Sequence, residues 1–157
     1  MSIGTQRRNN MNLEIENKSS FTIHEKKLKE FISIIYQKLN IPYNFDLSIL
    51  YVDVKEMQEL HFKWMKLNTP TDVMSFPMDP VDSQSKNKVK ILGDVIICPS
   101  VCWSESTFRR ENPARYFVFL HVHAILHLLG YDHQKFQARR VMKKLERELM
   151  IEIDKVK

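Results

Sequence analysis

The chain is poor in glycine and cysteine and contains no long apolar run. Its 3 glycines are Gly4, Gly93 and Gly130, so each of the two inner ones is expected to mark a backbone position with a special requirement. Its 2 cysteines, Cys98 and Cys102, are too few for a disulfide framework and are expected to be core thiols. No stretch approaches the roughly 20 apolar residues that span a bilayer, and the N-terminus lacks the apolar core of a secretory signal. These absences predict a reduced, cytoplasmic protein with no membrane partner.

The composition is that of an ordinary globular protein. Of 157 residues, 43% are hydrophobic and 10% aromatic, which suffices for one compact domain but not for two. Residues 1–11 are polar and basic, and we expect a disordered leader there, followed by a single domain over 12–157. The net charge of +5 favours polyanionic partners, nucleic acid first.

Hydrophobic periodicity predicts an α+β fold. Strands are expected over 13–16, 47–52, 72–76 and 91–98, and helices near 24–39, 53–66, 99–111, 113–129 and 136–153. Residues 78–90 are expected to form a surface loop. Strands interspersed with helices and then mostly helices predict a mixed sheet of about four strands packed with about five helices. In the last helix, Val141, Leu145 and Leu149 are expected to point inward.

Four of the 6 histidines lie between His121 and His133, the most distinctive feature of the chain. His123 and His127 are four apart, so on a helix they project from one face on successive turns. His121 is two residues from His123 and points to the other side, so we expect it to be packed or to support a ligand from behind. Gly130 is placed to end the helix in a left-handed conformation and to return His133 beneath the first pair.

Three neutral imidazoles that converge in this way suit zinc, although nickel, cobalt or copper would also bind. Histidines without metal are the alternative, but three at this spacing favour a metal site. The fourth position would stay open for water, as in catalytic zinc sites. The spacing also matches that of metzincin proteases, which need a glutamate directly after the first histidine. Ala124 stands there, which argues against proteolysis.

Three sequence blocks together resemble the YbeY family, bacterial rRNA maturation factors and endoribonucleases. Residues 123–133, HAILHLLGYDH, are similar to the family signature HGxLHLxGYDH, with Ala124 in place of the usual glycine. Residues 70–77, PTDVMSFP, resemble PTDVLSFP, and residues 92–95, LGDV, resemble LGDI. The blocks follow the family's order and spacing, so the resemblance covers about residues 12–153.

The resemblance implies an endoribonuclease specific for single-stranded RNA, with one zinc ion held by His123, His127 and His133. It further implies an α+β fold with the metal at the end of a central helix. The biological role would be 3′-end maturation of small-subunit ribosomal RNA and ribosome quality control, in contact with the ribosome. Many family members carry an arginine shortly before the PTD block, and Met65 occupies that position here.

The catalytic group other than a zinc-activated water is not identified by the sequence. Asp132 adjoins the third predicted ligand and could handle the proton, but a role in capping the turn or orienting a histidine is favoured. Asp72 and Asp94 could do likewise or could satisfy backbone groups.

RNA contacts are expected from basic residues around the histidine segment, namely Arg109, Arg110, Arg115, Arg139 and Arg140. The main alternative is a ribosome-associated RNA-binding protein whose zinc site is not catalytic. A metal hydrolase for a small substrate is a further alternative that the sequence leaves open.

Overall fold

The computed structural model describes residues 11–81, 90–132 and 134–156. In chain order these residues form nine elements: β1 (Leu13–Asn17), α1 (Glu25–Lys38), β2 (Phe45–Tyr51), α2 (Val54–Met65), β3 (Val73–Pro77), β4 (Lys90–Ile97), α3 (Pro99–Phe108), α4 (Pro113–Leu128) and α5 (Phe136–Asp154). The predicted α+β fold with a four-stranded mixed sheet and five helices is confirmed. Most of the predicted leader, residues 1–10, lies outside the described residues, whereas Met11 packs against the core.

The sheet has the strand order β1-β2-β4-β3. Strands β1, β2 and β4 are parallel, and β3 pairs antiparallel with β4 at the edge. The register between β2 and β4 shifts where Asp46 pairs with Ile91 but Leu47 pairs with Gly93, so Leu92 is an extra residue on β4. Glycine in a strand often marks such a bulge or a close approach of another segment.

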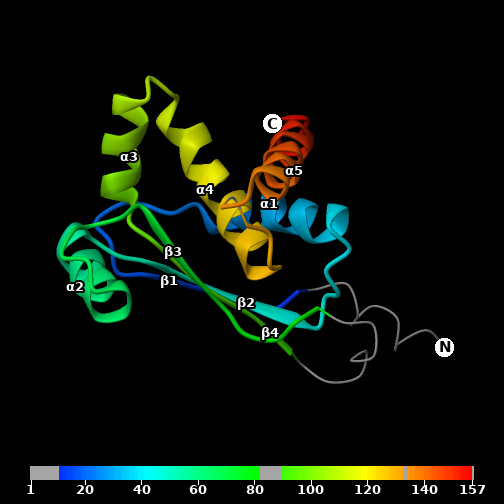
Figure 1. Ribbon diagram of the computed structural model, residues 1–157, viewed down its shortest axis with the longest axis horizontal. Helices are drawn as coiled ribbons and strands as arrows, with labels where there is room; N and C mark the ends of the chain where they lie inside the picture. Colours follow the sequence, from blue (N-terminus) through cyan, green and yellow to red (C-terminus); the bar gives the residue numbers. More distant parts are fainter. Residues whose placement is uncertain (1–10, 82–89, 133, 157) are drawn as a thin grey trace.

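Helices cover both faces of the sheet. In β2, Leu47, Ile49 and Tyr51 belong to the main core, together with buried side chains of α1, α4 and α5. Figure 1 shows these three helices together on one side of the sheet. The hydrophobic cluster on the opposite face of the sheet is smaller. There Met57 of α2 packs with Met74 of β3.

Helix α4 is the central helix that the family resemblance implies. Asn112 caps it, since its side-chain oxygen accepts a hydrogen bond from the backbone N–H of Arg115 at 3.0 Å, and Pro113 opens the first turn. It contacts α3, α5, β3 and β4, and along its second half Leu120, His121, Val122 and residues 124–126 are buried. A helix enclosed on several sides holds its side chains in fixed directions.

The amphipathic helix α5 is confirmed, but the predicted inward position of Val141 is wrong, because Val141 is 51% exposed. The buried positions of α5 are Met142, Glu146, Leu149, Met150 and Ile153. A spacing of four residues advances about 40° beyond a full turn. Two such steps therefore separate Val141 from Leu149 by about 80°, which moves Val141 off the buried face.

Candidate metal centre

His123 and His127 lie on one face of α4, as the four-residue spacing predicts. Their Nε2 atoms are 3.1 Å apart and their ring centroids 4.6 Å apart, with the ring planes nearly perpendicular. Two imidazole nitrogens that share a tetrahedral zinc ion, each about 2 Å from it, lie roughly 3.3 Å apart. The side chain of His123 is 25% exposed, so the pair is open to solvent on one side. The two histidines therefore fit a shared metal ion.

Glu146 approaches His123 from α5, on the side of the ring away from this nitrogen pair. Its Oε1 lies 3.5 Å from Nδ1 of His123, and the residue is 8% exposed. An imidazole that binds metal through Nε2 keeps a proton on Nδ1, and a carboxylate at that nitrogen fixes the tautomer and the ring orientation. Sequence reasoning missed Glu146. Its signal was a single carboxylate on the apolar face of an amphipathic helix.

His121 faces away from the pair, as expected from helix geometry, and is fully buried. Its Nδ1 donates to the Phe117 carbonyl oxygen at 2.8 Å, and its Nε2 lies 2.6 Å from the Tyr51 hydroxyl, which donates to it. Burial lowers the pKa of His121 to about 4. Both ring nitrogens are thus engaged in the core, which excludes His121 as a ligand.

The glycine turn that follows α4 has the predicted form. Gly130 has a φ of +93°, and two hydrogen bonds close a Schellman motif: Gly130 N–H to the His127 carbonyl and Tyr131 N–H to the Leu126 carbonyl, both at 3.0 Å. His133, the third predicted ligand, lies outside the described residues. Among the residues that the structure describes, no group of three His, Cys, Asp or Glu side chains converges on a metal position.

Two of the three candidate carboxylates, Asp132 and Asp72, make local hydrogen bonds in the structure. Asp132 is exposed, and its Oδ1 accepts a hydrogen bond from the Gln134 N–H at 3.0 Å, which stabilises the turn after Gly130. Asp72 accepts from the Tyr116 hydroxyl at 2.7 Å and thereby ties the start of β3 to α4. Asp94 is half-buried in β4. Of the two structural roles favoured for Asp132, capping the turn and orienting a histidine, its contact with Gln134 supports the first.

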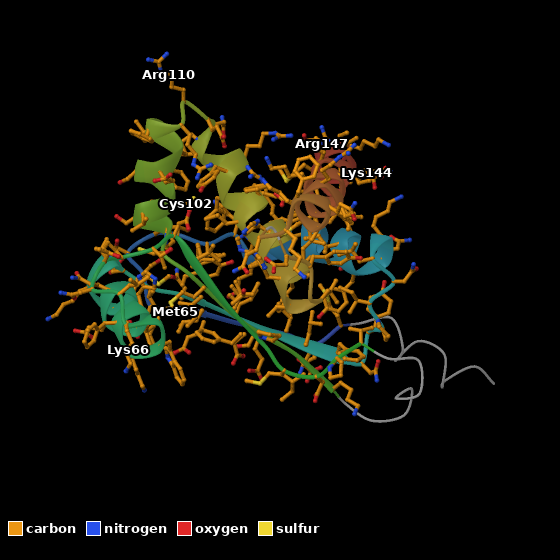
Figure 2. The ribbon with its side chains drawn as sticks, viewed as in Figure 1. Met65, Lys66, Cys102, Arg110, Lys144 and Arg147 are labelled. Atoms are coloured by element: carbon orange, nitrogen blue, oxygen red, sulfur yellow. The ribbon has the colours of Figure 1, made fainter. Side chains whose placement is uncertain are left out.

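Met65, at the position where the resemblance implies an arginine, is the last residue of α2 and is 50% exposed. Figure 2 shows it beside Lys66 at the end of α2. Lys66 has a φ of +59° and ends the helix. The two cysteines are free and buried, which confirms the prediction of core thiols.

Three of the five basic residues predicted to contact RNA lie together. Arg109, Arg115 and Arg140 line a cavity of about 650 Å³ between α4 and α5, next to Glu146 and Phe119. Arg110 and Arg139 are not among the lining residues, and Figure 2 shows Arg110 pointing outward beyond the end of α3. No helix within the described part of the chain is long and apolar enough to cross a membrane.

Comparison with known proteins gives one consistent family. The profile of "Endoribonuclease YbeY" matches residues 11–154. A protein of that name from Mycobacterium sp. (strain KMS) is 33% identical over 147 residues, which cover 90% of this chain and 83% of that protein. One from Beutenbergia cavernae is 35% identical over 144 residues, which cover 90% of this chain and 96% of that protein.

The fold agrees with a solved structure. The solution structure of a Thermotoga maritima protein superimposes with a TM-score of 0.63 and 21% identity, covering 90% of this chain and 88% of that one. The family profile and the relatives at 33% and 35% identity confirm the family resemblance drawn from the three sequence blocks, and the activity that comes with it is hydrolysis of RNA. This chain belongs to the YbeY endoribonuclease family.

Proposed function

We propose that this protein is a zinc-dependent endoribonuclease that cuts single-stranded RNA, with one metal ion held by His123, His127 and His133. The observation that carries the proposal is the Nε2–Nε2 separation of 3.1 Å in a solvent-accessible pair on a buried helix. The biological substrate would be the 3′ end of small-subunit ribosomal RNA, with a further part in ribosome quality control. An rRNA substrate implies action in the cytoplasm and contact with the ribosome.

Zinc bound there would activate water and polarise a phosphoryl oxygen. The chain's own residues would prepare the site for the ion. Neutral imidazoles add no negative charge, so the full positive charge of the ion would face the RNA phosphate. Glu146, 3.5 Å from His123 Nδ1, would hold that ring in the orientation that directs Nε2 toward the ion. Phe119, whose ring centroid lies 5.7 Å from that of His123, would exclude water from one side.

A site without catalytic activity is the principal alternative. Structural zinc sites are closed by four protein ligands, whereas catalytic ones keep a position open. Within the described residues, no cysteine or carboxylate completes a set with His123 and His127. With His133 as the third ligand, the fourth position would be free for water or substrate, which favours the enzyme.

The test compares RNA cleavage and metal content in highly purified wild-type, His127→Ala and His24→Ala proteins. His24 is exposed just before α1 and serves as the matched histidine control. We expect about one equivalent of zinc and RNA cleavage in the wild type and in His24→Ala, and loss of both in His127→Ala. A chelator should abolish cleavage, and added zinc should restore it.

Each alternative has a distinct result. Cleavage that survives removal of the metal would overturn the zinc-dependent enzyme. Bound metal without cleavage of any single-stranded RNA would favour the RNA-binding protein with a non-catalytic site. Hydrolysis of a small phosphodiester without cleavage of RNA would favour the small-substrate hydrolase.

A further inference from the structure

Helices α4 and α5 enclose a cleft of about 650 Å³. The α5 wall carries three lining cations, Arg140, Lys143 and Arg147. Their spacing of three and four residues aligns them on one face of the helix, over about 10 Å along its axis. These three residues are called the cation stripe below.

The cation stripe is available for a ligand. Arg140, Lys143 and Arg147 are exposed, and none forms an ion pair with a carboxylate of the described residues. By contrast, two other cations that line the cleft are engaged: Arg115 pairs with Asp154 at 3.0 Å and Arg109 pairs with Glu105 at 3.0 Å. No ion pair within the described fold therefore holds these three cations, although the carboxylates of Glu111 and Glu146 line the same cleft.

The α4 wall is aromatic. Tyr116 and Phe119 line the cleft, and their ring centroids are 6.0 Å apart. The row continues along the same face of α4, with 5.7 Å from Phe119 to His123 and 4.6 Å from His123 to His127. One line of rings thus joins the cleft to the histidine pair.

We infer that the cleft between α4 and α5 binds a single strand of RNA and leads it to His123 and His127. The cation stripe would contact successive phosphates, and the Phe119 ring would stack against a base. A charged wall facing an aromatic wall is the arrangement that binds unpaired strands, because their bases are free to stack on protein rings. A duplex keeps its bases stacked inside the helix, so it can contact only the cations of the cleft through its phosphates. The inference rests on the proposed function for its choice of RNA as the polyanion.

The test measures binding separately from cleavage. Full-length protein is titrated into a fluorescent 2′-O-methyl oligonucleotide of about ten nucleotides, within the range of single-strand site sizes, and anisotropy is followed over a series of salt concentrations. The double variant Lys143→Ala/Arg147→Ala is compared with Lys144→Ala. Lys144 is the adjacent residue, but it does not line the cleft and pairs instead with Glu148 at 4.0 Å; Figure 2 labels Lys144 and Arg147 on α5.

We expect the double variant to weaken binding on the order of ten-fold at low salt. It should also reduce the slope of log K against log salt by about 1.4, since each phosphate contact with a single strand contributes about 0.7. Lys144→Ala should leave both quantities unchanged. Phe119→Leu should weaken binding of the single strand with no change in slope, because stacking does not release counterions, and it should leave duplex binding unaffected.

The inference is overturned if the double variant behaves like Lys144→Ala, or if wild-type protein does not bind the single strand. It is also overturned if the protein binds duplex and single-stranded RNA with equal affinity and Phe119→Leu changes neither affinity. The cleft would then bind any polyanion through charge alone. Cleavage assays on the same variants separate the two proposals. If cleavage requires His127 but is unchanged in the Lys143→Ala/Arg147→Ala variant, the proposed function holds and the cleft does not bind the substrate.

Discussion

The Tyr51 hydroxyl lies 2.6 Å from Nε2 of His121 and joins β2, one of the two inner strands of the sheet, to the buried side of the histidine helix. Both residues are fully buried, and the opposite ring nitrogen of His121 donates to the Phe117 carbonyl. The same helix therefore carries histidines with two different tasks. His121 attaches α4 to the sheet, and His123 and His127 face the solvent-accessible side.

Tyr51→Phe should destabilise the protein by about 1–3 kcal/mol, because it leaves the acceptor nitrogen of His121 buried without its donor. Zinc affinity should not change, because the substitution lies on the side of α4 opposite to His123 and His127. Urea unfolding and a metal titration measure the two effects. Tyr43→Phe is the control, since the Tyr43 hydroxyl donates no hydrogen bond to any described residue. A loss of zinc affinity without a loss of stability would contradict the division of tasks.

Glu146→Gln should weaken zinc binding by about 10- to 100-fold, the range found when a partner of a metal-bound histidine is removed. The amide keeps the size of the side chain but not its charge, so the fold should be preserved. Competition with a chromophoric chelator gives the dissociation constant. The cobalt-substituted protein gives a second readout, since a reoriented His123 would alter its visible spectrum.

The control for that experiment is Glu148→Gln, since Glu148 lies two residues further on the same helix with its side chain 57% exposed. It should bind zinc like the wild type. Equal zinc affinity for Glu146→Gln and Glu148→Gln would show that Glu146 has no part in holding the ligand.

Alanine should be tolerated at Gly130 and not at Gly93. A Cβ at Gly130 would meet nothing within 4 Å, so its cost is that of the positive φ alone, about 1 kcal/mol. A Cβ at Gly93 would collide with the Phe76 carbonyl oxygen and lie 2.7 Å from Leu128 Cδ2. Relieving that collision should cost about 3 kcal/mol or more. Chemical unfolding gives the loss of stability of each variant, which should be larger for Gly93→Ala. An equal loss of stability in the two variants would contradict this prediction.

Both cysteines should be unreactive in the folded protein. Burial raises the pKa of the Cys98 thiol and raises that of Cys102 to about 12, so neither supplies thiolate near pH 8. Ellman's reagent should therefore detect almost no thiol in the native protein and both thiols after unfolding in urea. Rapid labelling without denaturant would contradict this packing.

Local sequence signals predicted the elements well. Pro99 and Pro113 each open a helix at the expected residue, and Gly130 ends α4 in the expected left-handed conformation. Such signals depend only on residues a few positions apart in the chain, so they can be recognised in one sequence without knowledge of the fold. The spacing of His123 and His127 is of the same kind, because helix geometry alone brings their rings together.

Relationships between elements could not be obtained in this way. Glu146 meets His123 only because α5 packs against α4, so the periodicity of α5 can place Glu146 on the apolar face but cannot identify its partner. Two of the three residues of the cation stripe, Lys143 and Arg147, were missed for the same reason: they resemble Lys144 in sequence and differ from it only in the face of the helix they occupy. Strand order also depends on long-range pairing, which a local pattern does not encode.

The position of α5 has a consequence for how the protein is made. Leu149 and Met150 of α5 complete the core beside α4, and Glu146 of the same helix reaches His123. During synthesis these residues follow both histidines, so the histidine helix emerges before the segment that covers it. A nascent chain that stops before α5 would expose apolar surface and lack the carboxylate beside His123. The ribosome would thus have to complete α5 before the histidine pair could gain its carboxylate partner and its covered core.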